Sequence, residues 1–134
     1  MSMKGVIIVD NSLPAGLQAN IPAVLSLSVG KAFPEIVGHD VNTKEGVVYR
    51  GITRIPLPIL QTSSENLKDL HEKAEEEGLY SACFTNMALA TKSYNDYEEK
   101  VSNSKSTDLI IHGLAIYGEK KSINRISGNL GLLK

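Results

Sequence analysis

The chain has 134 residues, of which 42% are hydrophobic and 22% are charged, and its formal net charge at pH 7 is −1. These values are ordinary for a globular protein with one sizeable core, and they give no overall argument for a nucleic-acid partner. The charge is unevenly distributed, since residues 61–99 carry three basic and nine acidic side chains, whereas residues 100–134 carry six basic and two acidic. The basic C-terminal part favours anionic partners, although solvated helix faces are the simpler explanation.

The cysteine content and the N-terminal sequence indicate the cellular compartment. Cys83 is the single cysteine, so the sequence excludes an intramolecular disulfide and a cysteine-based metal cluster. The chain enters the apolar run KGVIIVD without the layout of a signal peptide, and no stretch approaches membrane-spanning length. We therefore expect a soluble, cytoplasmic protein without a metal or a cofactor.

The N-terminal third predicts a strand and a helix. Residues 6–9 are a continuous apolar run, which is typical of a strand covered on both faces. Pro22 indicates the first turn of the following helix, because proline lacks the N–H group that this turn leaves unpaired. The helix is expected to begin near Pro22, with Asn20 just outside it, and to end at Pro34. Its core-facing stripe is expected to consist of Ile21, Val24, Leu25, Val29, Ala32 and Phe33.

The middle of the chain predicts short strands and a second helix. Residues 35–55 are expected to contain short strand segments, including Val47–Tyr49. The next strand should lie at a sheet edge or pair on one side only, because Pro56 and Pro58 lack N–H groups on the same side. The motif TSSE at 62–65 predicts a helix capped by Thr62, with Gly78 at its end. Its buried stripe is expected to be Leu67, Leu70 and Ala74.

The remaining segments complete an alternating pattern. The stretch LYSACFT at 79–85 is typical of a strand, and the long apolar stretch 109–117 predicts a central strand. Between them, residues 86–103 are expected to form an irregular or helical segment. A short helix near 119–127 should end at Gly128, followed by an edge strand or tail. The side chains expected to face inward from the segment between the strands are Tyr94, Tyr97 and Val101.

This alternation predicts a single α/β domain over residues 1–134, with helices on both faces of a mixed sheet. Ligands of such sheets bind near the carboxyl ends of strands, beside helix N-termini. The passage 11–21 is longer than the usual connection of about 2–6 residues, so we expect it to line a pocket.

Two segments carry a family resemblance. KGVIIVDNSLPAG near the N-terminus and INRISGNLGLLK at the C-terminus resemble the first strand and the closing helix and tail of the archaeal- and eukaryotic-type peptidyl-tRNA hydrolases. The stretches NIPAVLSLSVGKAFPEIVGHD, EGVVYRGI and PLPIL are similar to an uncharacterised bacterial and archaeal family, the domain of unknown function numbered two thousand. This resemblance implies a three-layer α/β/α fold around a mixed sheet of about four strands, of the peptidyl-tRNA hydrolase II type. The matching positions of the two terminal segments are Lys4, Val6, Ile7, Val9, Leu13, Gly16, Ile123, Ile126, Ser127, Gly128, Leu130, Leu132 and Leu133.

The catalytic positions of the hydrolases fall on other residue types in this chain. The resemblance places their lysine on Ala19, their histidine on Ser26 and their aspartate on Thr85 or Asn86. Their threonine falls near His112. Because the lysine and the aspartate are both replaced, the resemblance implies the fold without the cleavage of peptidyl-tRNA.

The residues expected to form a ligand pocket are Asn11, Asn20, Thr85, Asn86 and His112. Asn20 would present its amide beside a helix N-terminus, where free N–H groups attract anions, or would simply cap the helix. His112 is able to exchange a proton near neutral pH, although most strand histidines serve the core. The ligand would be a neutral or anionic small molecule with carbonyl or phosphate oxygens. If the pocket is catalytic, His112 is the acid or base, Asn20 stabilises an oxyanion, and the resemblance favours hydrolysis of an acyl ester or amide.

Other features have simpler explanations, and a second class of function stays open. Cys83 is expected to be inert core, and His39 with Asp40 a surface loop with too few ligands for zinc. The alternative function is a non-enzymatic, homodimeric interaction module that kept the fold and lost the chemistry, with the basic C-terminal part as its contact surface. An enzymatic pocket instead requires its polar groups to converge within about one small ligand's width.

Overall fold

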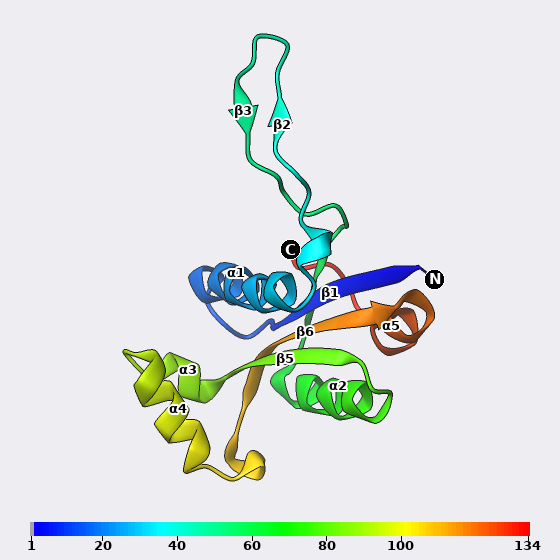
Figure 1. Ribbon diagram of the computed structural model, residues 1–134. Coiled ribbons are helices and arrows are strands. Elements are labelled where there is room, and N and C mark those ends of the chain that lie inside the picture. The colour runs from blue at the N-terminus through cyan, green and yellow to red at the C-terminus, as the bar shows by residue number, and fades with distance from the viewer. Residues whose placement is uncertain (1) are drawn as a thin grey trace.

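The computed structural model describes residues 2–134. At its centre lies a four-stranded sheet with the order β4-β1-β6-β5 (Figure 1). The central strands β1 (Met3–Asp10) and β6 (Ile111–Glu119) are antiparallel. The edge strand β4 (Ile59–Thr62) is parallel to β1, and the edge strand β5 (Tyr80–Thr85) is antiparallel to β6. The two longest apolar runs thus form the two central strands, and the segment after the prolines lies at an edge, as the sequence predicts.

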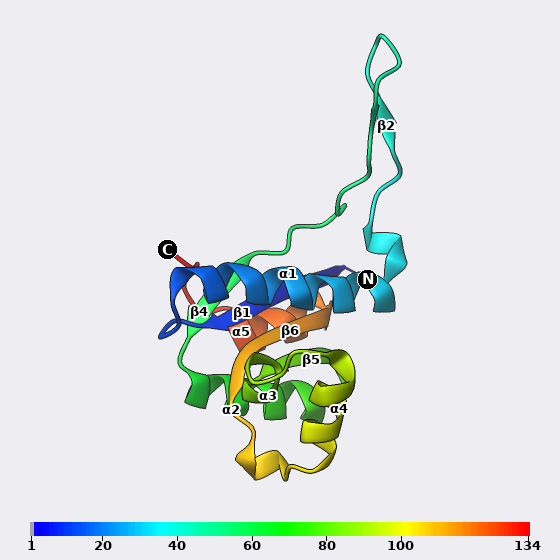
Figure 2. The ribbon, with the colours of Figure 1, turned by 90° about the vertical axis from the view of Figure 1, so that its left-hand side faces the viewer.

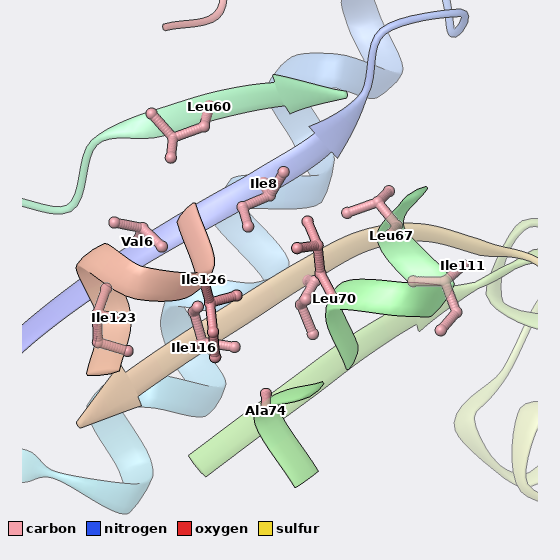
Figure 3. Close-up of a cluster of buried hydrophobic side chains, with 11 residues drawn as sticks. Val6, Ile8, Leu60, Leu67, Leu70, Ala74, Ile111, Ile116, Ile123 and Ile126 are labelled. Atoms are coloured by element: carbon pink, nitrogen blue, oxygen red, sulfur yellow. The ribbon is translucent and has the colours of Figure 1, made fainter. Parts of the chain in front are cut away.

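Helices cover both faces of the sheet (Figures 1 and 2). On one face, α1 (Ala15–Ala32) packs over the inward side chains of β1 and β6. On the other face, α2 (Ser64–Glu76) and α5 (Lys120–Ser127) enclose a second cluster of buried side chains (Figure 3). The α/β class and the mixed sheet are therefore confirmed. Figure 3 labels the residues Val6, Ile8, Leu60, Leu67, Leu70, Ala74, Ile111, Ile116, Ile123 and Ile126 of this second cluster.

The start of α1 differs from the expectation. The helix begins at Ala15, directly after Pro14, and Pro22 lies inside it as a buried residue. Proline in a helix interior leaves one carbonyl, here that of Gln18, without its usual donor. Burial of Ile21 and Pro22 against the sheet offsets that loss, so tertiary packing overrides the local rule. The expected long loop is therefore wrong, and only residues 11–14 connect β1 to α1.

This shift also changes the exposed side of α1. Asn20 is an exposed residue within the helix rather than a residue preceding it. Of the expected stripe, Ile21, Leu25 and Val29 are buried, whereas Val24 and Ala32 are exposed. The inward face of α1 is therefore narrower than its apolar composition predicts.

The ends of α2 show one correction and one confirmation. The helix is capped by Ser63, whose hydroxyl accepts the N–H of Asn66 at 3.1 Å. Thr62, the expected cap, is instead the last residue of β4 and accepts a bond from the Asn66 side chain at 2.9 Å. Gly78 follows the helix with a φ of +69°, the left-handed conformation that glycine adopts readily. The expected buried stripe of α2 is confirmed.

The segments after β5 and α5 pack at the periphery. After β5 the chain forms α3 (Asn86–Leu89), α4 (Tyr94–Ser102) and a 3-10 turn (Ser106–Asp108). The sequence predicts an inward-facing Tyr94, but this residue is 77% exposed. The reason is that α4 lies beside the sheet rather than over it (Figure 1). The C-terminal tail bonds to the free edge of β4, where the N–H of Leu133 donates to the carbonyl of Ile59 at 2.9 Å. The expected edge position of the tail is confirmed.

A two-stranded ribbon leaves the body of the protein between α1 and β4 (Figures 1 and 2). A 3-10 turn (Pro34–Ile36) leads into β2 (Val41–Asn42), which pairs antiparallel with β3 (Val48–Tyr49). We call residues 37–54 the arm.

Candidate functional site

Polar side chains gather where several strands end. The carboxyl ends of β1, β4 and β5 and the amino end of β6 lie at the same edge of the sheet. There β1 ends in Asp10 and β5 ends in Thr85, which pairs with Ile111 of β6. Because Phe84 pairs with Gly113, His112 is an extra residue in this ladder, a β-bulge. Bulges redirect side chains and are frequent beside functional sites.

The register of β1 on β6, in which Val9 pairs with Gly113, places His112 opposite Asp10. Asp10 is only 2% exposed, and the Nδ1 atom of His112 lies 2.9 Å from its Oδ2 atom. The other carboxylate oxygen, Oδ1, accepts the backbone N–H of Ser12 at 2.9 Å and the Ser12 hydroxyl at 2.7 Å. The buried carboxylate is thus fully hydrogen-bonded, and it fixes the orientation of the imidazole.

Electrostatics determine which nitrogen of the imidazole carries the proton. Burial works to raise the pKa of the Asp10 carboxyl, but the hydrogen bonds from Ser12 and His112 outweigh it, so this pKa lies below its ordinary value. Asp10 is therefore ionised at neutral pH and accepts from Nδ1–H of His112. In the neutral imidazole this tautomer leaves Nε2 unprotonated and basic.

The Nε2 atom is also accessible. Within residues 2–134 it has no hydrogen-bond partner, and it is not a fully buried atom. The side chain of His112 as a whole is 14% exposed. A buried carboxylate behind an oriented imidazole with an open Nε2 is an arrangement suited to general acid–base catalysis.

Thr85 supplies a second unusual group at the same edge. It is 6% exposed, and its Oγ1 atom is buried without a hydrogen-bond partner in the described part of the chain. Leaving a buried hydroxyl unpaired costs about 1–3 kcal/mol, so such a group marks a place where a ligand or water completes the bonding. Thr85 lines a pocket of about 370 Å³ beneath α2, together with Lys68, Ser106, Thr107 and Ile111.

The fold and family of the chain follow from comparison with known proteins. The model of the family described as "Protein of unknown function (DUF2000)" matches residues 3–134. The chain belongs to this family. The DUF2000 chain also matches a solved structure of a protein of unknown function from Agrobacterium tumefaciens strain C58. The TM-score is 0.91 at 19% identity, and the match covers 100% of this chain and 99% of that one, which establishes a shared fold. Among curated proteins, none matches the chain.

The other site residues expected from the sequence of this DUF2000 chain lie in different surroundings. Asn11 is exposed in the turn after β1, and its carbonyl accepts from Gln18 at 3.3 Å. The amide oxygen of Asn86 accepts the backbone N–H of Ile110 at 3.0 Å, so this side chain holds the entry to β6. The expected position of Asn20 beside a helix N-terminus is wrong, and the ligand-binding roles of these amides stay predictions.

Two further sequence features of the DUF2000 chain can now be placed. Burial and the nearby Glu75 carboxylate raise the pKa of the Cys83 thiol to about 12, so it is a poor nucleophile. Asp40 lies on the arm, where it bonds Arg50 at 2.8 Å and accepts the N–H of Gly51 at 2.9 Å. No three His, Cys, Asp or Glu side chains within residues 2–134 are grouped to hold a metal ion. No helix in the same range is long and apolar enough to cross a membrane.

Sequence reasoning selected His112 and Thr85 but did not pair the histidine with Asp10. Asp10 and His112 are 102 positions apart, and a strand that ends in aspartate is ordinarily explained as the start of a turn. The available signal was the pair of apolar runs, since two central strands that pair antiparallel place the end of one beside the start of the other.

Proposed function

We propose that this chain hydrolyses an acyl ester or amide, with His112 as general base and acid and Asp10 as the residue that positions it. The observation that carries the proposal is the 2.9 Å contact between Nδ1 of His112 and the buried Asp10 carboxylate, which leaves Nε2 open. A buried aspartate that fixes the tautomer of a histidine is a recurring device of acyl-transfer catalysts.

The proposed reaction uses water as the nucleophile. Nε2 of His112 takes a proton from a water molecule as its oxygen attacks the acyl carbon, and the negative charge of Asp10 stabilises the imidazolium that forms. The imidazolium then returns its proton to the departing alcohol or amine, which leaves a carboxylic acid as the second product.

Two arguments support an acyl substrate over other classes. Both ends of the chain resemble peptidyl-tRNA hydrolases, enzymes whose substrate is an ester. We include in this proposal a fold of the peptidyl-tRNA hydrolase II type. The pocket beside Thr85 combines the charged groups of Lys68 and Glu72 with the hydroxyls of Ser106 and Thr107, which suits a ligand with carbonyl oxygens; His112 lies outside its lining. Ala19 stands where the hydrolases have lysine, so peptidyl-tRNA itself is not the expected substrate.

The test measures turnover by the purified full chain. The substrates are a series of p-nitrophenyl acyl esters of increasing chain length, the matching anilides, and N-acetyl-aminoacyl-tRNA. The variants are His112→Gln and Asp10→Asn, and His39→Gln is the matched control because this histidine is exposed on the arm. Circular dichroism and thermal unfolding verify that each variant is folded.

The expected result is ester or anilide turnover that falls at least about a hundredfold in His112→Gln, with a smaller but clear loss in Asp10→Asn. His39→Gln should match the parent, and cleavage of the tRNA ester should be weak. The proposal is refuted if no substrate is turned over, or if His112→Gln keeps full activity while folded. Efficient cleavage of the tRNA ester would show that Ala19, in place of the lysine of the hydrolases, does not prevent this reaction.

The second candidate function is a non-enzymatic interaction module that acts as a homodimer. The observation that favours it is the arm, whose side chains are exposed in the isolated chain. Both functions are compatible in one protein, because the arm and the Asp10–His112 pair lie in different parts of the fold.

A further inference from the structure

The arm exposes an unusual amount of apolar surface for a segment outside the core. Large apolar side chains stand on it along its whole length, and none of those named below belongs to the two buried clusters. An isolated two-stranded ribbon is at best marginally stable in water, and contiguous exposed apolar surface marks an interaction site. The side chains and their exposures are Val37 47%, Val41 60%, Val47 50%, Val48 51%, Tyr49 62% and Ile52 81%.

The arm is nevertheless built as an ordered element rather than a loose loop. Its base is tied by the N–H of Gly38, which donates to the carbonyl of Ile52 at 2.8 Å, and by the ion pair between Arg50 and Asp40. At this base Gly51 has no room for a side chain, since a Cβ there would lie 1.8 Å from the carbonyl oxygen of Gly38. The tip turns at Gly46 with a φ of +88°. The sequence therefore specifies a projecting ribbon, whose tip lies far from the body of the protein (Figures 1 and 2).

The total surface of the chain shows how much of it is left uncovered. The solvent-accessible area is 8464 Å². A compact monomer of the same mass, 14.5 kDa, exposes about 6,900 Å². The excess of about 1,600 Å² exceeds the roughly 800 Å² that each partner contributes to an interface of standard size. Part of this excess is the surface of a ribbon that projects from the body, and it leaves room for an interface of standard size.

We propose that residues 37–54 form a dimerisation arm that packs on the α1–α4 surface of a second copy of this chain, whose own arm packs reciprocally. This inference is independent of the proposed hydrolysis. The partner of the arm is a second copy because the same chain also carries a surface, between α1 and α4, on which the arm can pack. We call this surface the acceptor. Val24 and Tyr94 line a pocket of about 430 Å³ between α1 and α4, whose other lining residues are both apolar and polar. Leu27, one helical turn from Val24, is 76% exposed. In a two-fold dimer each such contact occurs twice.

Charge supports this pairing and argues against nucleic acid. The arm carries Lys44, Arg50 and Arg54 against Asp40 and Glu45, whereas α4 carries three acidic residues and one basic residue. An arm of net charge +1 on one copy and a helix of net charge −2 beside the acceptor pocket of the other attract each other. A ribbon that binds phosphates would need a larger excess of positive charge than this one has.

The test compares the mass of the full chain in solution with that of surface variants, by sedimentation equilibrium or light scattering up to about 100 µM. Ile52→Asp lies on the arm, Leu27→Asp lies on the acceptor, and Leu132→Asp is the matched control. Leu132 is a 59% exposed apolar residue of the C-terminal tail, outside both surfaces. All three positions are exposed, so circular dichroism should show that the body of each variant stays folded. A mixture of Ile52→Cys and Leu27→Cys chains, treated with a bifunctional maleimide, tests the direct contact.

The expected results are a parent mass of twice 14.5 kDa, a monomer for Ile52→Asp and for Leu27→Asp, and an unchanged dimer for Leu132→Asp. The cysteine mixture should give a cross-linked dimer. A parent that stays monomeric at about 100 µM overturns the proposal, including the case in which it binds an oligonucleotide or another protein. A dimer that survives Ile52→Asp overturns the role of the arm, and one that survives Leu27→Asp overturns the α1–α4 acceptor.

Discussion

Gly113 is the point where α1 rests on the centre of the sheet, and replacing it with alanine tests that packing directly. A Cβ at this position would lie 2.3 Å from Cγ2 of Ile21 and 3.2 Å from Cδ1 of Leu25. Carbon atoms in contact prefer about 3.5–4.0 Å, so α1 and β6 would have to separate by more than about 1 Å. The branch methyl of Ile21 cannot turn aside easily, because a β-branched side chain in a helix has one strongly preferred rotamer.

The magnitude follows from this geometry. Overpacking in a core costs about 1–3 kcal/mol, and the severity of this clash places Gly113→Ala in the upper part, at about 2–3 kcal/mol. For a chain of 134 residues, unfolding entropy near 60 °C makes each kcal/mol worth about 3.5 °C. The melting temperature of Gly113→Ala should therefore fall by about 7–11 °C in differential scanning calorimetry.

Two further variants separate this clash from a general effect of adding a methyl group. Gly30 lies in α1, the helix that carries Ile21, and a Cβ there would have no atom within 4 Å. Gly30→Ala should therefore raise the free energy of unfolding by about 0.5–1 kcal/mol through helix propensity. Ile21→Leu removes the clashing Cγ2, so adding it to Gly113→Ala should recover part of the loss. If Gly113→Ala unfolds at the same temperature as the parent or higher, α1 does not rest on β6 as described.

Three other outcomes are expected. Leu114→Ala, at a position with 0% exposure in β6, should cost about 2–5 kcal/mol in urea unfolding, and a cost near zero would mean that this strand is not central. Folding lowers the pKa of Asp10, so its stabilisation is complete above the unfolded value of about 3.9 and is lost as the pH falls through the folded value. The stability difference between the parent and Asp10→Asn should therefore be largest near neutral pH and shrink below about pH 4, and a difference that grows there would contradict the sign. The Cys83 thiol, with a pKa of about 12 instead of 9.0, should react with iodoacetamide at pH 8 about fortyfold more slowly in the folded chain than in urea, because the greater nucleophilicity of its thiolate offsets part of the loss in thiolate fraction, and equal rates would refute its burial.

The layers of the fold were predictable because burial leaves a clear local pattern. Central strands covered on both faces appear as unbroken apolar runs, and the prolines before β4 restrict that strand to an edge. The buried stripe of α2 follows helical spacing, and Gly78 announces its end. Each of these signals lies within a few residues of the element that it predicts.

The errors arose where contacts distant in sequence decide the outcome. Pro22 lies inside a helix instead of in its first turn, because α1 is stabilised by the packing of Ile21 and Leu25 on β6. Ser63 replaced Thr62 as a cap because the length of β4 is set by its pairing with β1. The Asp10–His112 contact depends on the register of β1 on β6, which has no short sequence signature. The candidate site was therefore only partly predictable, although its edge of the sheet was predicted.

The pairing of β1 with β6 has a consequence for the way the chain reaches its native state. The central ladder joins Val6 to Ile116, so β1 finds its main partner only after the whole stretch between these two residues has been synthesised. Closing so long a loop is entropically costly before any contact rewards it, and folds dominated by such contacts form slowly. Until β6 arrives, β1 is an apolar strand with an open edge, a state that favours aggregation. Emergence of β6, rather than emergence of the N-terminal half, should therefore be the moment at which this sheet assembles.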